Sequence, residues 1–237
     1  MTNAELIQLR TPTSLTYRGR SVAEQNSVDV AWRLLMSDQF TDLRDCIYSS
    51  VEELERFRQL VVNITMATDI ADKEFQQLRK SRWKIAFDEQ STASDGLEDE
   101  QDEDPKVDVC RKATITLEHI VQASDVAHTM QHWHIYLKYN KRLFEERYLA
   151  WQKGVAGEDD PSVGWYKGEL GFFDFYIIPL ARKLDRCGVF GVSYHEYLQY
   201  AISNRTEWEE KGEAIVKEML SECRCKYGEE KEEKPEF

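Results

Sequence analysis

The sequence predicts an all-α protein, and two observations indicate this class. Glycine and proline are scarce, at 11 and 5 of 237 residues. Between them, apolar residues recur at three- and four-residue spacing, which is typical of amphipathic helices. Hydrophobic residues make up 41% of the chain and aromatic residues 11%, enough for a sizeable core. We therefore expect a compact multi-helix bundle.

The first half of the chain carries two capping-box signatures, each followed by an apolar stripe. They are Ser21-Val-Ala-Glu24 and Ser50-Val-Glu-Glu53, and each predicts the start of a helix. A polar stretch, Asp69-Ile-Ala-Asp72, predicts a turn before the next helix. The helices expected here cover about residues 21 to 37, 50 to 66 and 72 to 87.

An acidic segment, residues 88 to 108, separates these helices from the rest. It includes Asp95-Gly-Leu-Glu-Asp-Glu-Gln-Asp-Glu-Asp-Pro105, which is too acidic to be buried, so we expect a mobile loop. The loop is either simply solvated or a regulatory or cation-attracting insert. Beyond it, helices are expected over about residues 109 to 126, 128 to 153, 163 to 185 and 193 to 224. A charged tail, residues 226 to 237, follows.

Charge and cysteine usage limit the partners and the compartment. Lys and Arg total 31 against 44 Asp and Glu, a formal charge of −13. With no local basic patch, this surface repels nucleic acid polymers and anionic lipid. The five cysteines are scattered and form no Cys-x-x-Cys, which favours a reducing cytoplasm. No signal peptide or apolar membrane span is present, although an anchored longer parent protein stays open.

Four of the five histidines lie within residues 119 to 134, which raises the question of a metal site. On one continuous helix, Asp125, His128 and His132 would share a face and reach one cation. However, a His-x-x-x-His pair alone is a weak signal, and the Glu of His-Glu-x-x-His is absent. The alternative is that these histidines are structural. The chain also has no Gly-x-Ser-x-Gly elbow and no glycine-rich phosphate loop.

Four stretches, in this order and spacing, resemble the catalytic domain of class I 3',5'-cyclic nucleotide phosphodiesterases. The resemblance runs from about Asn3 to about Gly212 and covers roughly the C-terminal two thirds of the family's domain. It implies an all-helical fold, and we expect residues 1 to 225 to be the C-terminal portion of such a domain. The stretches are Tyr17-Arg-Gly-Arg-Ser-Val-Ala-Glu24, Val62-Asn-Ile-Thr-Met-Ala-Thr-Asp69, Ile120-Val-Gln-Ala-Ser-Asp-Val126 and Glu169-Leu-Gly-Phe-Phe-Asp-Phe-Tyr-Ile-Ile-Pro-Leu180.

The family hydrolyses cyclic nucleotides with two divalent cations, usually zinc and magnesium, that share a bridging hydroxide. By this resemblance Asp125 is a metal ligand. Glu24 and Thr68 match positions that hold metal-bound waters, although Glu24 is equally explained as a capping-box carboxylate. His132 is then structural.

The resemblance also implies a nucleotide pocket. Glu169 stands where the family has the Gln that reads the purine edge, and Phe172 where a Phe stacks on the ring. Leu143 aligns with the opposite apolar wall, and His128 with a residue beside the nucleotide. Because a carboxylate accepts from both guanine N1–H and the exocyclic amine, we expect a tilt toward cyclic GMP or loose selectivity. Arg147 stands where the family has a second apolar wall residue. This departure weakens the expected packing of the base between Phe172 and the opposite wall.

Two family motifs are not found in full. His-Asn-x-x-His, which supplies the general-acid histidine and one metal ligand, is absent, so no catalytic residue is assigned. Asn3 aligns with the last residue of His-Asp-x-x-His-x-Gly-x-x-Asn, which supplies two more ligands. Since one carboxylate does not hold two divalent ions, we expect this chain alone to be inactive. It is either a phosphodiesterase with a start codon assigned too late or a truncated helical binding or regulatory module, and a homodimer is open.

Overall fold

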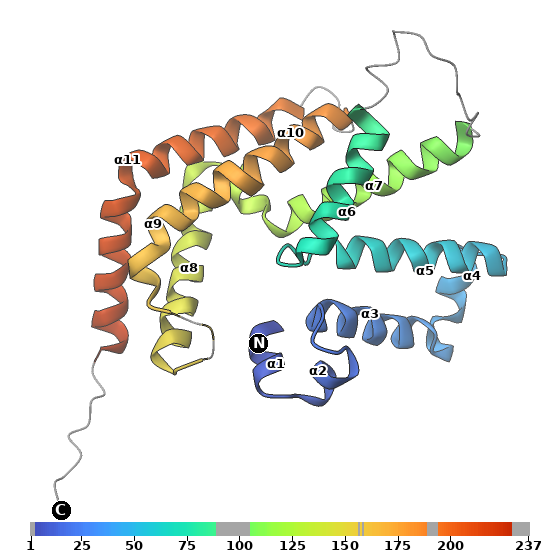
Figure 1. The fold of residues 1–237 in the computed structure, drawn as a ribbon, viewed down its shortest axis with the longest axis horizontal. Coiled ribbons are helices and arrows are strands. Elements are labelled where there is room, and N and C mark those ends of the chain that lie inside the picture. Colours follow the sequence, from blue (N-terminus) through green and yellow to red (C-terminus); the bar gives the residue numbers. More distant parts are fainter. Residues whose placement is uncertain (1–2, 89–104, 156, 158, 189–193, 229–237) are drawn as a thin grey trace, which may run out of the picture. The chain divides into compact units, whose positions relative to one another are not determined.

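The computed structural model describes residues 3–88, 105–155, 157, 159–188 and 194–228, and the described residues are helical with no strand. The all-α prediction is therefore confirmed. The chain divides into two compact units, Met1–Asp125 and Val126–Phe237, each described below by itself. Figure 1 labels the elements.

The first unit consists of short N-terminal helices followed by longer ones. Contacts link α1 to α3, α3 to α5, and α5 to α7. Its buried apolar residues include Val22, Ala67, Trp83 and Ile115. Its elements are α1 (Asn3–Gln8), α2 (Pro12–Thr16), α3 (Val22–Leu35), the 3₁₀ turn η1 (Asp38–Phe40), α4 (Thr41–Ile47), α5 (Val51–Met66), α6 (Lys73–Trp83), the π-helical turn η2 (Lys84–Asp88) and α7 (Pro105–Asp125).

The two capping-box predictions have different outcomes. The prediction at α5 is confirmed, because the Ser50 side chain accepts a hydrogen bond from the Glu53 N–H at 3.3 Å. At α3 the predicted helix is present, but the predicted side-chain cap is wrong, because Ser21 has a left-handed backbone and its side chain makes no capping bond. Instead the Ser21 hydroxyl donates to Asp69 at 2.6 Å. A long-range partner thus replaces the local cap.

The acidic segment is shorter at its C-terminal end than expected. Helix α7 begins at Pro105 and not near residue 109, and a proline suits the first turn of a helix because its missing N–H has no intrahelical partner there. Residues 89 to 104, where the loop was expected, lie outside the described part of the chain.

The histidine-rich stretch is not one continuous helix, so the expected shared face is wrong. Helix α7 ends at Asp125, His128 lies in a short 3₁₀ turn, η4 (Ala127–Met130), and His132 is the N-cap of α8 (Trp133–Gln152). Because these three residues do not belong to one helix, the 3.6-residue spacing does not put their side chains on a shared helix face.

The second unit packs its helices along one long C-terminal helix, α11 (Tyr194–Tyr227). Helices α8, α9 (Pro161–Phe172) and α10 (Ile178–Cys187) all contact α11 (Figure 1). A π-helical turn, η5 (Phe173–Ile177), joins α9 to α10, and Pro179, which lacks a backbone N–H, follows it. The buried side chains include Tyr136, Phe144, Phe173, Ile177 and Trp208.

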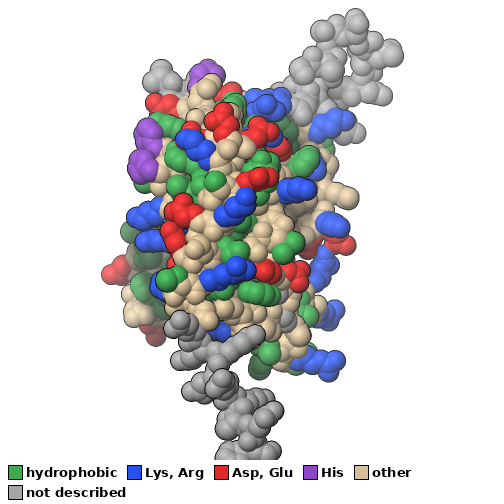
Figure 2. All heavy atoms as spheres, turned by 90° about the vertical axis from the view of Figure 1, so that its left-hand side faces the viewer, with side chains coloured by type: hydrophobic (Ala, Val, Ile, Leu, Met, Phe, Trp, Pro, Cys, Tyr) green, Lys and Arg blue, Asp and Glu red, His purple; other side chains and the backbone are tan. Residues whose placement is uncertain are grey.

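Charged side chains of both signs are interspersed on the face drawn in Figure 2. Ion pairs connect α8 to α11: Lys141 lies 2.7 Å from Glu218, and Lys226 lies 2.6 Å from Glu145. Such exposed pairs each contribute about 0–1 kcal/mol, so packing holds these helices together. None of the described helices is long and apolar enough to span a membrane.

Gly212 lies where α11 packs against α9, and we predict that Gly212→Ala destabilises the second unit. A Cβ there would lie 2.8 Å from both the Trp208 and Tyr166 rings, so the rings must move. Overpacking of this kind costs about 1–3 kcal/mol, measurable by urea denaturation. Gly164→Ala on α9 is the control, because its Cβ meets nothing within 4 Å. Equal stability of the two variants would contradict this packing.

Candidate functional site

In the first unit, the side chain of Asn3 positions Glu24. The Asn3 Nδ2 donates to Glu24 Oε2 at 3.0 Å, and its Oδ1 accepts from the Ala23 N–H at 2.8 Å. This two-point contact fixes the Glu24 carboxylate at the first turn of α3 and leaves its second oxygen to accept from another donor. Asn3 is thus a positioning residue for Glu24.

Two further hydrogen bonds gather three helix ends. The Ser21 hydroxyl, before α3, donates to Asp69, and Gln122 Nε2 on α7 donates to the Ala67 carbonyl at 2.8 Å. Thr68 stands between Ala67 and Asp69, just beyond α5. The start of α3, the end of α5 and the last turn of α7 are therefore tied together by buried polar contacts.

Asp125 is the last residue of α7 and is exposed. The protein around its carboxyl group partly excludes water and raises its pKa, so a neighbouring cation would stabilise its charged form. Within the described residues, no group of three or more His, Cys, Asp or Glu side chains is arranged to hold a metal ion. Asp125 offers one carboxylate and does not form a complete metal centre with them.

In the second unit, a directional chain of hydrogen bonds ends at Glu169. Trp165 Nε1 donates to Asn140 Oδ1 at 3.1 Å, Asn140 Nδ2 donates to the Tyr136 hydroxyl at 3.2 Å, and that hydroxyl donates to Glu169 Oε2 at 2.7 Å. Because an indole N–H only donates, it fixes the amide orientation of Asn140. The Tyr136 proton is consequently directed at Glu169.

Burial perturbs both ends of this contact. Tyr136 is fully buried, and its pKa is raised by that burial and by the charge of Glu169. Burial also raises the pKa of the Glu169 carboxyl above its usual value, while the hydrogen bonds from Tyr136 and Asn140 lower it in part. Glu169 is therefore a fixed carboxyl group that takes up a proton more readily than a solvated glutamate.

The other expected pocket residues lie on neighbouring elements of the second unit. Phe172 ends α9 and stacks on Tyr176 with ring centroids 5.3 Å apart. Leu143 is on α8, which packs against α9, and its side chain is 41% exposed. His128 is half-buried with its ring 5.4 Å from that of Tyr139, and burial lowers its pKa, which favours the neutral imidazole.

Two other histidines have packing contacts. His119 is buried, its Nδ1 lies 2.7 Å from the Ile115 carbonyl, and its ring contacts Trp83. The His132 Nε2 lies 3.1 Å from the Tyr200 hydroxyl. These contacts favour the structural interpretation of both side chains.

The comparison with family models decides the classification. The model described as 3'5'-cyclic nucleotide phosphodiesterase matches residues 1–188, more than half of the chain. The chain belongs to this phosphodiesterase family.

Curated phosphodiesterases resemble the chain at low identity. The human dual specificity calcium/calmodulin-dependent 3',5'-cyclic nucleotide phosphodiesterase 1C is 25% identical over 185 residues, which is 75% of this chain and 23% of that protein. The bovine form 1B is 24% identical over 185 residues, covering 30% of its length. The chain thus spans less than a third of these relatives.

A solved structure agrees on the phosphodiesterase fold. The phosphodiesterase domain of the Salpingoeca rosetta rhodopsin phosphodiesterase superimposes with a TM-score of 0.64 and 18% identity, covering 96% of this chain and 64% of that domain. At this identity the likeness shows the fold alone.

Sequence reasoning missed the residues that position the Glu169 carboxyl group. The expected pocket did not include Tyr136, Asn140 or Trp165. Tyr136 and Trp165 are aromatic residues at helical spacing, which are usually core. A usable signal exists: Tyr136 and Asn140 are four apart on α8, as are Trp165 and Glu169 on α9. Each pair shares one face of its helix. Polar side chains repeated on the facing sides of two packed helices therefore predict a chain of hydrogen bonds between them.

Proposed function

We propose that this chain carries the base-recognition pocket and one metal ligand of a 3',5'-cyclic nucleotide phosphodiesterase, with a preference for cyclic GMP over cyclic AMP. The hydrogen-bond chain from Trp165 to Glu169 supports it most strongly. It fixes the carboxyl group of Glu169, the residue that by the sequence resemblance stands where the family reads the base.

The preference follows from donor and acceptor complementarity. When ionised, Glu169 only accepts hydrogen bonds, and guanine offers two donors on one edge, N1–H and the exocyclic amine. Adenine offers a donor at its amine, but its N1 is an acceptor that would face a carboxylate oxygen. Ionised Glu169 therefore favours guanine. Phe172 would stack on the purine, with Leu143 and the neutral His128 imidazole as further contacts.

The family's zinc and magnesium, when bound, neutralise the phosphate and supply the attacking hydroxide. The residues of this chain do not fit that centre by themselves, because catalytic zinc alone takes about three protein ligands and the described residues contain no such group. We assign Asp125 as one ligand, with Glu24 and Thr68 holding metal-bound water. The other ligands belong to His-Asn-x-x-His and His-Asp-x-x-His-x-Gly-x-x-Asn, which this sequence lacks.

The five cysteines are free thiols, which supports the proposal of a reducing, cytoplasmic compartment.

Binding of cyclic nucleotides to the 237-residue chain tests the proposal. We expect calorimetric titration to show cyclic GMP binding more tightly than cyclic AMP, and no hydrolysis of either nucleotide with added zinc and magnesium. A helical module that recruits partners predicts no binding of either nucleotide. Equal affinity for cyclic GMP and cyclic CMP would also contradict purine recognition.

A further inference from the structure

A cavity in the first unit has no part in the proposed function. Its volume is about 600 Å³, within the range of about 300–1,000 Å³ typical of small-molecule sites. It opens beside the turn between α2 and α3 and is lined from that turn, α3, α5 and α6. Glu24, Thr68 and Asp125 do not line it.

One wall of the cavity is apolar. Val28 on α3 is buried, and the other three side chains are half-buried: Val62 and Met66 on α5 and Phe75 on α6. Together they present two aliphatic side chains, a thioether and an aromatic ring. Such a wall gains free energy by removing the apolar part of a ligand from water.

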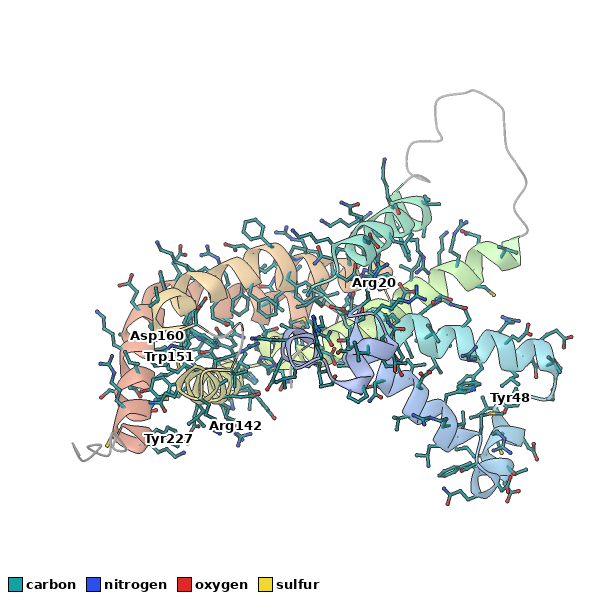
Figure 3. All side chains as sticks on the ribbon, turned by 60° about the horizontal axis from the view of Figure 1, so that its bottom comes forward. Arg20, Tyr48, Arg142, Trp151, Asp160 and Tyr227 are labelled. Atoms are coloured by element: carbon teal, nitrogen blue, oxygen red, sulfur yellow. The ribbon has the colours of Figure 1, made fainter. Side chains whose placement is uncertain are left out.

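Three arginines, Arg18, Arg20 and Arg58, also line the cavity. Arg20, labelled in Figure 3, pairs with Glu74 and Asp72 of the α6 start. Within the described residues, Arg18 and Arg58 make no ion pair, and the Arg58 guanidinium lies 5.6 Å from the centre of the Trp32 ring.

The lining offers Arg18 and Arg58 no carboxylate that pairs with them. Its one acidic residue is Asp29, whose carboxylate already accepts a hydrogen bond from the Tyr17 hydroxyl at 2.6 Å. Guanidinium groups match carboxylate and phosphate geometry with paired N–H donors.

Backbone strain coincides with the cavity. In the described chain, the non-glycine residues with positive φ are Arg10, Arg18 and Ser21, and Arg18 and Ser21 line the cavity. Strained conformations of this kind gather at ligand-binding turns, where the surrounding structure holds them. The strain, the unpaired cations and the apolar wall occur at one place.

We propose that this cavity binds a small organic anion that carries an apolar body. Its carboxylate or phosphate group lies on Arg18 and Arg58. Its apolar body lies against the wall formed by Val28, Val62, Met66 and Phe75. The site is separate from the nucleotide pocket, which belongs to the second unit, and so does not depend on the proposed function.

Ligand-observed NMR and calorimetry on the 237-residue chain test this site with matched probes. The probes are 4-phenylbutyrate, its uncharged amide, phenyl phosphate and inorganic phosphate. We expect phenylbutyrate and phenyl phosphate to bind, and the amide and inorganic phosphate to bind about tenfold or more weakly, since each lacks one of the two contacts. If inorganic phosphate binds as tightly as phenylbutyrate, the apolar wall does not contribute to binding, and the proposal is wrong.

Variants locate the bound anion. The double variant Arg18→Gln/Arg58→Gln should lose about tenfold or more in phenylbutyrate affinity. Arg56→Gln, on the same helix and outside the lining, removes a like charge and should bind as the parent does. Val62→Phe fills the cavity without changing charge and should also abolish binding; circular dichroism checks that each variant is folded. Unchanged affinity in the folded double variant, or displacement of phenylbutyrate by cyclic GMP, would overturn the proposal.

Discussion

Replacing Glu169 by Gln is expected to move the nucleotide preference from cyclic GMP toward cyclic AMP. The amide donates one hydrogen bond and accepts another, so it complements adenine N1 and its amine, whereas the carboxylate only accepts. A paired base contact discriminates by about 1–3 kcal/mol, so the ratio of the two dissociation constants should change by about tenfold or more. Titration calorimetry with both nucleotides in mildly alkaline buffer measures this ratio.

Glu146→Gln is the matched control for Glu169→Gln, because Glu146 is an exposed acid of the same unit. It removes the same charge and should leave the ratio unchanged. A ratio that moves equally in both variants would show a general charge effect and contradict base reading by Glu169.

The same preference should depend on pH. Because burial raises the native pKa of Glu169, lowering the pH through that value protonates the carboxyl group, which then donates one bond and accepts one, like glutamine. The parent's preference for cyclic GMP should therefore weaken in mildly acidic buffer, while that of Glu169→Gln stays constant. The pH dependence of folding stability has the opposite direction. Ionising a carboxyl group whose native pKa is raised destabilises the native state. The free energy of unfolding of the parent should therefore fall relative to that of Glu169→Gln as the pH rises.

The second large effect is expected at Asp125. We predict that the chain hydrolyses cyclic nucleotides when it is preceded by a family segment carrying both histidine motifs. In this extended chain, Asp125→Asn should lower kcat at least about a hundredfold, since even loss of a group that supports a metal ligand costs about 10–100-fold. The release of 5'-monophosphate with zinc and magnesium measures this.

Two comparisons separate metal ligation from general effects. Glu24→Gln should lower activity less than Asp125→Asn, by about 10–100-fold, because its role is to orient water. Asp42→Asn, at an exposed carboxylate on α4, should leave activity unchanged. Full activity of the Asp125→Asn chain would contradict the assignment of Asp125 as a metal ligand.

Local sequence signals predicted the elements whose ends are fixed by neighbouring residues. Ser50 caps α5, and Asp72 caps α6 by accepting from the Glu74 and Phe75 N–H groups. The Gly188 αL residue ends α10 close to the expected boundary. In each case the bond that decides the boundary spans a few residues, so the pattern contains it.

Features decided by distant partners were not predictable. Ser21 donates to Asp69, 48 residues away, and Tyr136 donates to Glu169, 33 residues away. Helical periodicity does not reveal the partner of the Tyr136 hydroxyl. A helix boundary near residue 127 was expected, but the turn η4 and the later start of α8 at Trp133 were not. Asp125, His128 and His132 have helical spacing whether or not one helix contains them.

Binding of cyclic GMP at Glu169 is tested most directly by the indole N–H resonances of the six tryptophans. The Trp165 N–H heads the hydrogen-bond chain to Glu169, and Trp165→Phe identifies its signal in a ¹H–¹⁵N spectrum. Titration with cyclic GMP should move the Trp165 signal and leave that of Trp32, in the first unit, in place. A Trp165 signal that stays fixed at saturating cyclic GMP would contradict nucleotide binding at Glu169.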